Sequence, residues 1–136
     1  MNIVIVSHFH YIYTQIAKHT PKFASIFVTG PGRTVDELIG FIASLKPEII
    51  IIDIRLNFQA GLEVIRKIRT FTYPITIITT VVASSEKYRI RCMEAGANNH
   101  FRLPEEYYEL GNLISRLCNA HQPGDKNVIG KNREYA

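Results

Sequence analysis

The chain has 136 residues, of which 46% are hydrophobic and 21% charged, a balance typical of one globular domain. No run of about 18 apolar residues occurs, so no membrane-spanning helix is expected. The start, residues 1–6, lacks the basic segment of a secretion signal and is predicted to be a strand. The net charge of +4 comes without a dense Lys/Arg cluster, so direct nucleic-acid binding by this chain is not expected.

The cysteine content points to a reducing compartment. Cys92 and Cys118 follow no CxxC spacing, and two cysteines are too few for a disulfide-based fold or a zinc site. We therefore expect a cytoplasmic location. Both thiols are interpreted as packing or surface groups rather than as catalytic ones.

Short apolar runs predict the strands. They show little of the alternation typical of a strand with one face in water, which favours parallel strands covered on both faces by helices. The runs lie at residues 3–6, 24–28, 49–52, 75–78 and 100–103.

Helical signals lie between the runs. The first predicted helix covers about residues 11–19 and has a thin apolar stripe. Thr34 and Glu37 have the spacing of a capping box, which starts the second helix. A tight turn through Gly61 is expected to lead into the third helix, and Gly96 is expected to end the fourth, because glycine tolerates a positive φ.

The alternation of five strands and five helices predicts an α/β domain with right-handed crossovers. This domain is expected to cover residues 1–119. Residues 120–136 lose hydrophobic periodicity and are interpreted as a C-terminal tail or linker.

Ligands of open parallel sheets bind beyond the carboxyl ends of the strands, so the residues there form the candidate site. Asp53 ends an all-isoleucine strand, where an unpartnered buried carboxylate would be costly. Asp53 is either a functional carboxylate or a strand-end residue whose side chain accepts hydrogen bonds from the N–H groups of the following loop. The candidate residues are Ser7, His8, Asp53, Arg55, Thr79, Thr80, Leu103 and Pro104.

A set of spaced motifs goes beyond the α/β pattern. Gly61 follows Asp53 by eight residues, Pro74 precedes Thr79 by five, and Pro104 follows Gly96 by eight. With Leu62-Glu63 and Glu94-Ala95-Gly96-Ala97, these motifs make the chain resemble a response regulator receiver domain over about residues 2–118. The family name comes from these motifs together, since each alone is weakly specific.

The resemblance implies a CheY-like, flavodoxin-like (βα)5 fold with a doubly wound parallel sheet in the order 2-1-3-4-5. It implies that Asp53 accepts a phosphoryl group from a histidine kinase, a phosphotransfer protein or a small phosphodonor. Thr79 or Thr80 would contact that group, and His100 occupies the aromatic switch position of the fifth strand. No catalytic residue of an enzyme is expected.

The family's partner surface is formed by the fourth helix, the fifth strand and the fifth helix. The resemblance therefore implies output through a protein partner or a self-dimer on this surface. His100 and Tyr107 or Tyr108 are its expected exposed residues.

The sequence departs from the family at the charged positions of the pocket. Ser7 and His8 stand where the family has an acidic pair, and Leu103 stands where it has a lysine. Mg²⁺ prefers carboxylate oxygens, so Mg²⁺ binding is doubtful and no cofactor is expected. Arg55 could replace part of the lost positive charge or be an exposed loop residue. Zn²⁺ on His8 and Asp53 would have only two protein ligands.

The missing charges allow an estimate of how much slower phosphoryl transfer should be. Two unit charges about 4 Å apart interact by about 4 kcal/mol at an effective dielectric constant of roughly 20. Losing the lysine and the metal ion should therefore slow phosphoryl transfer roughly a thousandfold or more.

Several functional hypotheses stay open. The first is a receiver-like domain with a degenerate pocket that signals through protein contacts, and the second is a working phosphoacceptor in which Arg55 and backbone amides replace the metal ion. The third is the receiver half of a DNA-binding transcriptional regulator whose effector domain is absent from this chain. A small-molecule enzyme is disfavoured because no glycine-rich loop follows the first strand.

Overall fold

The computed structural model describes residues 1–7, 10–30, 32–54, 58–82 and 86–120. Strands and helices alternate along the chain, as predicted from the sequence. The elements are β1 (Asn2–Val6), α1 (His10–Ala17), β2 (Ser25–Thr29), α2 (Val35–Leu45), β3 (Ile49–Asp53), α3 (Phe58–Ile68), β4 (Thr76–Val82), α4 (Glu86–Ala95), β5 (Asn99–Leu103) and α5 (Tyr107–Ala120). Among the described helices, none combines the length and the apolar character needed to cross a membrane.

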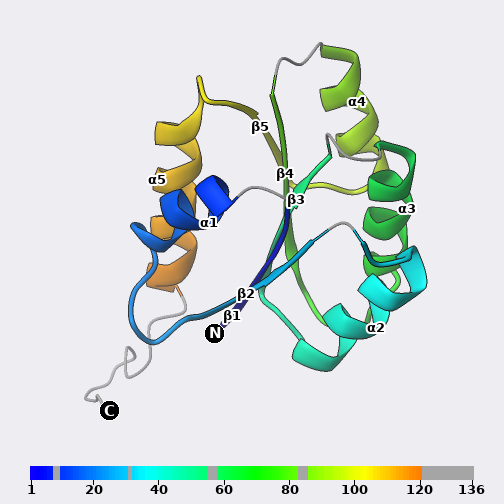
Figure 1. The fold of residues 1–136 in the computed structure, drawn as a ribbon, viewed down its shortest axis with the longest axis horizontal. Helices are drawn as coiled ribbons and strands as arrows, with labels where there is room; N and C mark the ends of the chain where they lie inside the picture. The colour runs from blue at the N-terminus through cyan, green and yellow to red at the C-terminus, as the bar shows by residue number, and fades with distance from the viewer. Residues whose placement is uncertain (8–9, 31, 55–57, 83–85, 121–136) are drawn as a thin grey trace.

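The five strands form one sheet in the order β2-β1-β3-β4-β5, and every neighbouring pair is parallel. The predicted doubly wound order is therefore confirmed. Helices α1 and α5 cover one face of the sheet, and α2, α3 and α4 cover the other (Figure 1). The chain leaves the centre of the sheet in opposite directions after β1 and after β3, which creates the crevice where ligands bind in such folds.

Two apolar cores lie on the two faces of the sheet, and β3 belongs to both. Ile50 and Ile52 pack with residues of α2, α3 and α4. Ile49 and Ile51 pack with residues of α1 and α5. Because side chains alternate along a strand, Asp53 falls on the face of Ile49 and Ile51. The uninterrupted isoleucine run thus buries β3 on both sides, as the sequence indicated.

The structure corrects two predicted boundaries. Strand β4 runs to Val82, so Thr79 and Thr80 lie within the strand and not after it. Threonine is β-branched and suits a strand, although its hydroxyl interrupts the apolar run. Helix α3 begins at Phe58, so Gly61 lies inside the helix and not in a turn before it. There a Cβ would come 3.4 Å from Ile54 Cγ2, so the site holds a small residue comfortably.

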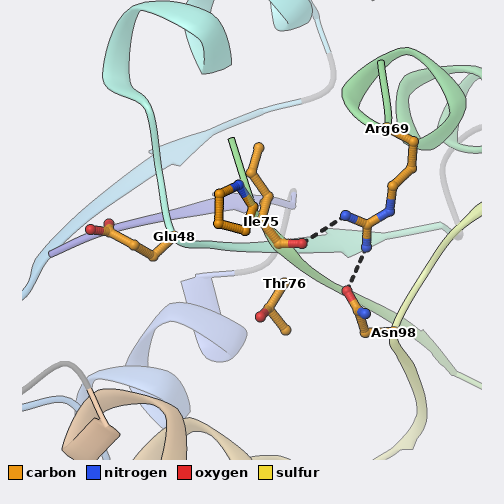
Figure 2. Close-up of a pocket in the computed structure, with 6 residues that line it drawn as sticks. Glu48, Arg69, Ile75, Thr76 and Asn98 are labelled. Atoms are coloured by element: carbon orange, nitrogen blue, oxygen red, sulfur yellow. Dashed lines mark hydrogen bonds between the residues drawn. The ribbon is translucent and has the colours of Figure 1, made fainter. Parts of the chain in front are cut away.

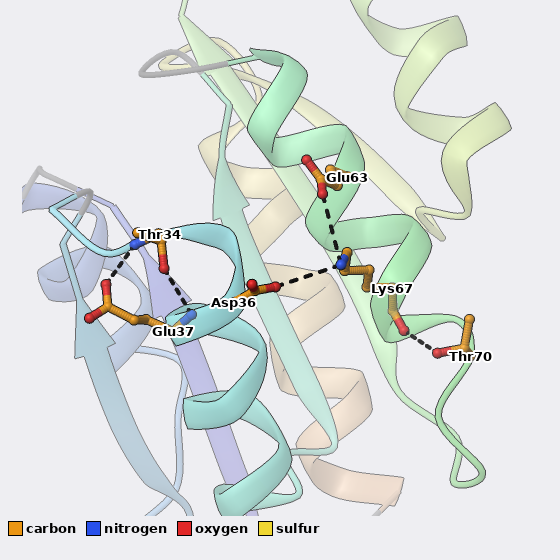
Figure 3. A network of polar contacts seen from close by, with 6 residues as sticks. All are labelled: Thr34, Asp36, Glu37, Glu63, Lys67 and Thr70. Carbon is orange, nitrogen blue, oxygen red and sulfur yellow. Dashed lines mark hydrogen bonds and ion pairs between the residues drawn. The ribbon is translucent and has the colours of Figure 1, made fainter.

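The capping box predicted for α2 is confirmed (Figure 3). The backbone N–H of Glu37 donates to Thr34 Oγ1 at 3.1 Å, and the backbone N–H of Thr34 donates to Glu37 Oε1 at 2.8 Å. Lys67 of α3 lies 3.7 Å from Asp36 of α2 and 3.9 Å from Glu63 of its own helix. These ion pairs are largely exposed and stabilise the α2–α3 packing only slightly.

Candidate functional site

Three polar side chains lie in a row across the carboxyl edge of the sheet. Asp53 closes β3, is only 5% exposed and is in register with Thr80 of β4. Ser7 follows β1 and is also buried, and its hydroxyl donates to Asp53 Oδ2 at 3.4 Å. Partners in register on adjacent strands project to the same face. Ser7, Asp53 and Thr80 therefore share the face covered by α1 and α5, as three neighbours from three strands.

Thr79 and Thr80 project to opposite faces. Ile78 packs in the core beneath α1 and α5, which places Thr80 on that face, next to Asp53. Ile77 and Val81 pack in the core beneath α2, α3 and α4, which places Thr79 on that one. The structure therefore separates two residues that the sequence left as alternatives.

The Thr79 hydroxyl is engaged in a buried contact with His100. Thr79 is in register with His100 of β5, and its Oγ1 lies 2.7 Å from His100 Nδ1. The thiol of Cys92, on α4, also hydrogen-bonds Thr79. Burial raises the pKa of that thiol, against smaller lowering effects of Thr79 and of the Arg91 charge. These contacts link β4, β5 and α4.

His100 lies among charged groups but is not a freely exposed residue. Burial lowers the pKa of its imidazole, the charge of Arg89 lowers it further, and Glu106 and Glu86 oppose the shift. Its Nε2 atom is buried and has no hydrogen-bond partner among the described residues. A polar cavity of about 160 Å³ is lined by Glu86, Arg89, His100, Arg102 and Glu106.

We expected His100 and either Tyr107 or Tyr108 to be exposed; this holds for a tyrosine but not for His100. His100 is half-buried, and its Nδ1 lies 2.7 Å from Thr79 Oγ1. Tyr107 is half-buried and packs edge-on against Tyr11 of α1, with ring centroids 5.2 Å apart. Tyr108 is 75% exposed, as expected.

Leu103, which the resemblance places at the family's lysine position, is buried in the apolar core under α1 and α5. It is in register with Val82 of β4. The next residue, Pro104, is exposed, and the backbone N–H of Arg102 donates to Glu106 Oε1. Strand β5 therefore ends in a hydrocarbon side chain, not a cation.

The residues that the structure describes at this edge do not by themselves fit Mg²⁺. Asp53 is the one carboxylate in the row, and its described neighbours offer hydroxyls where Mg²⁺ prefers carboxylates. Within the described ranges, no three His, Cys, Asp or Glu side chains gather as a metal site. His8 and Arg55 lie outside the described residues, as does the predicted tail from residue 121 onward.

A cavity of about 420 Å³ lies at the opposite, amino end of the strands (Figure 2). Arg69, at the end of α3, crosses it and donates to the carbonyls of Gly96 and Ile75, each at 2.7 Å, and to Asn98 Oδ1 at 2.5 Å. Burial lowers the pKa of this guanidinium. The three hydrogen bonds connect the end of α3 to the start of β4 and to the α4–β5 connection. Arg69 therefore has a structural role.

Sequence reasoning missed the surroundings of His100. Glu86 and Arg89 lie one helical turn apart on α4, a spacing that signals an ion pair, and their charged groups are 3.6 Å apart. Nothing in the sequence shows that this pair faces β5. The buried contact of Cys92 with Thr79 was equally hidden, because it depends on how α4 packs on the sheet.

Solved receiver domains share this fold. The signal receiver domain of a DNA binding response regulator protein (merR) from Colwellia psychrerythraea 34H superposes with a TM-score of 0.72 and 20% identity, over 90% of this chain and 99% of that one. A response regulator receiver protein from Pseudoalteromonas atlantica gives a TM-score of 0.70 and 17% identity, over 90% and 100%. At these identities the likeness shows the fold alone.

Curated relatives are longer than this chain. A protein-glutamate methylesterase/protein-glutamine glutaminase of Clostridium acetobutylicum is 24% identical over 68% of this chain and 28% of its own length. Response regulator GacA of Pseudomonas aeruginosa is 22% identical over 71% of this chain and 45% of its own length. The matched part of this chain thus spans less than half of either relative.

A family model matches most of the sequence. The model of the response regulator receiver domain matches residues 12–114, which include Asp53, both β4 threonines and His100. The match covers more than half of the chain and agrees with the strand order and with the motifs around Asp53. The chain therefore belongs to the response regulator receiver domain family.

Proposed function

We propose that the chain is an atypical receiver domain of a cytoplasmic two-component pathway, with Asp53 as its phosphoacceptor. The observation that carries the proposal is the position of Asp53. It is a buried carboxylate at the carboxyl end of the central strand, flanked by the hydroxyl residues Ser7 and Thr80. A histidine kinase, a phosphotransfer protein or a small phosphodonor would supply the phosphoryl group.

The pocket's composition supports slow phosphorylation. Attack of a carboxylate on a phosphoryl group brings negative charges together, and cations normally offset this. Ser7 and His8 stand where the resemblance places the family's acidic metal ligands, and Leu103 stands where it places the lysine. We expect neutral hydrogen-bond donors to carry the remaining stabilisation, at a rate roughly a thousandfold below that of a full set of charges.

Output would pass through the surface of α4, β5 and α5. This surface carries Ile90 and Tyr108 as exposed apolar residues, 48% and 75% exposed, beside the charged residues Arg89 and Arg102. Such a mixture suits a protein partner or a second copy of the chain. The domain itself would signal by binding and would not catalyse a reaction on another substrate.

A second candidate is the receiver half of a DNA-binding transcriptional regulator. It is favoured by relatives such as the transcriptional regulatory protein DesR of Bacillus subtilis, 45% of whose length the match spans. The reading frame downstream of the Ala136 codon tests this directly. A helix-turn-helix domain there would support the candidate, and a stop codon would contradict it.

The phosphoacceptor role is tested with acetyl phosphate and intact-mass measurement, with and without Mg²⁺. We expect a slow gain of about 80 Da, the mass of one phosphoryl group, that depends little on Mg²⁺. Asp53→Asn should abolish the gain, because an amide does not attack phosphorus. Glu63→Gln, an exposed carboxylate on α3, is the matched control and should leave it unchanged. A gain that persists in Asp53→Asn, or no gain in the unaltered chain, would contradict the proposal.

A further inference from the structure

Strand β2 is an edge strand whose composition does little to prevent further pairing. It has one neighbour in the sheet, β1, and its five residues, Ser25–Thr29, include no charged residue and no proline. Edge strands usually carry lysines, prolines or bulges, which keep a second strand away from the open backbone. In β2, the apolar Val28 is instead 48% exposed. The strand therefore has the properties of one that can accept a partner strand.

The hydrogen bonds to β1 show which backbone groups of β2 face outward. The N–H of Ser25 donates to the carbonyl of Met1 at 2.8 Å, and the carbonyl of Thr29 accepts from the residue after β1 at 3.1 Å. The backbone groups of successive residues in a strand point alternately to its two sides. The N–H and carbonyl groups of Ile26 and Val28 therefore face away from β1, toward the side where no described strand pairs.

Strand β5, at the other edge of the sheet, is built differently. Its Arg102 is exposed and charged, and the backbone N–H of that residue donates to Glu106 Oε1 at 2.6 Å. A strand added there would have to displace the carboxylate and approach a charged side chain, and both requirements disfavour pairing. Strand β2 has no charged side chain that could act in this way. Of the two edges, β2 is therefore the one suited to accept a further strand.

We propose that β2 pairs with β2 of a second copy of this chain in antiparallel orientation, so that the two sheets become continuous. A twofold axis at Phe27 places Ile26 of each copy opposite Val28 of the other, and these are the residues whose backbone groups face outward. The pairing forms four hydrogen bonds between the copies. The two Phe27 residues then lie opposite each other without direct hydrogen bonds, a type of pair in which side chains approach closely and stabilise the sheet.

The charges around β2 favour a second copy in this orientation. Since the strand carries no charge, two copies can approach without like charges opposite each other. The exposed Lys22 lies before β2, whereas the exposed Asp36 and Glu37 lie in the first turn of α2, which follows β2. Antiparallel pairing directs the basic start of one strand toward the acidic segment after the other, twice around the axis. In a parallel arrangement, like charges would meet instead.

The expected dimer is weak. Contact between two strands of five residues is small beside the roughly 1,200–2,000 Å² that a stable interface buries. We therefore expect a dissociation constant of roughly 100 μM. The dimer goes beyond the proposed phosphoacceptor role and does not depend on it, because its contacts lie at the sheet edge and not at Asp53.

Sedimentation velocity of the unphosphorylated full chain, from about 5 to 500 μM, tests the dimer. Val28→Lys places a charge within the paired segment and should weaken association about tenfold or more. Ile90→Lys is the matched control, because Ile90 on α4 is also 48% exposed, and it should leave association unchanged. Lys22→Glu should weaken association about two- to fivefold, the effect of an exposed charge pair. Circular dichroism checks that each variant is folded.

Hydrogen exchange in the unaltered chain tests the register and needs no variant. The amides of Ile26 and Val28 face the second copy, whereas that of Phe27 faces β1. Raising the concentration from about 20 to 500 μM should slow exchange at Ile26 and Val28 about threefold, because these amides exchange from the monomer. The Phe27 amide should change less.

Four outcomes would overturn the proposal. A chain that stays monomeric over the whole range forms no such dimer, and a dimer that Ile90→Lys abolishes and Val28→Lys preserves has its contact on α4. Strong protection of Ile26 and Val28 at every concentration would show that another segment of the same chain covers the edge. Protection of Phe27 alone would exclude the register. Should Val28→Lys not fold, Val28→Pro replaces it, since proline removes the outward N–H group. None of these outcomes changes the phosphoacceptor proposal for Asp53.

Discussion

At the scale of single residues, His100 connects β4 to the charged side chains of α4 and β5. One ring nitrogen faces Thr79 and the other is buried beside a cavity lined by two arginines and two glutamates. The neutral ring can accept a hydrogen bond from the Thr79 hydroxyl, whereas the protonated ring can only donate. The protonation state of His100 therefore decides how Thr79 is held.

His100 should make the stability of the domain depend on pH. Its pKa in the folded chain is lowered from 6.5, chiefly by burial and then by Arg89, so the unfolded chain binds the proton more readily. The contribution of His100 is therefore fully present above about pH 6.5 and is lost as the pH falls toward the folded-state pKa. Urea unfolding between about pH 5 and pH 8 should show this decline.

His100→Asn is the matched variant for that measurement. An asparagine oxygen can accept from Thr79 in place of Nδ1, but the amide does not titrate in this range. The variant should therefore lose less stability on acidification than the unaltered chain. Equal slopes for the two proteins would show that other groups cause the decline.

The residue scale is also where sequence reasoning reached its limit. Asp53 could be identified because a carboxylate after four isoleucines has few structural explanations. The roles of Thr79 and Thr80 could not be separated, because the sequence leaves open which of two successive residues faces the carboxylate. That choice depends on the β3–β4 register, which is a property of the assembled sheet.

At the scale of elements, α2 shows how local sequence fixes a helix start. Two reciprocal hydrogen bonds between Thr34 and Glu37 satisfy backbone N–H groups that the first turn leaves open. Thr34→Ala removes the side-chain acceptor and should lower the free energy of unfolding by about 1 kcal/mol in urea. Thr34→Ser keeps the acceptor and should cost far less.

Ser44→Ala on the same helix is the control for that prediction. Ser44 donates to the carbonyl of Phe41 within the helix, so its hydroxyl satisfies no open N–H group. Its removal should change stability by less than about 0.5 kcal/mol. Equal losses for Thr34→Ala and Ser44→Ala would argue against the capping box as the source of stability.

The predicted element boundaries were right where neighbouring residues determine them and wrong where contacts between distant residues do. The capping box and the isoleucine run of β3 were identified from the sequence, since each requires only neighbouring residues. The end of β4 was placed too early, because two successive threonines interrupt the apolar run that marked the strand. Their place in the strand follows only from their pairing with β3 and β5. The start of α3 was placed too late, since Gly61 suggested a turn and is instead part of the helix.

At the scale of the whole molecule, the sheet should be most rigid at its centre. Residues of β3 are buried throughout, and the strand pairs with β1 on one side and β4 on the other. Strand β2 is an edge strand, with one neighbour and two exposed residues. Native-state hydrogen exchange should therefore find the amides of Ile50–Ile52 among the slowest, and those of β2 clearly faster. Similar protection in β2 and β3 would contradict this gradient.

The burial of Leu103 also bears on how such a domain could evolve. A lysine introduced there alone would enter an apolar core under α1 and α5, where its ammonium group would be driven toward the uncharged form. A variant with a lysine at this position would therefore first need looser packing around it, at a loss of stability. The packing under α1 and α5 therefore limits which side chains this strand end can carry.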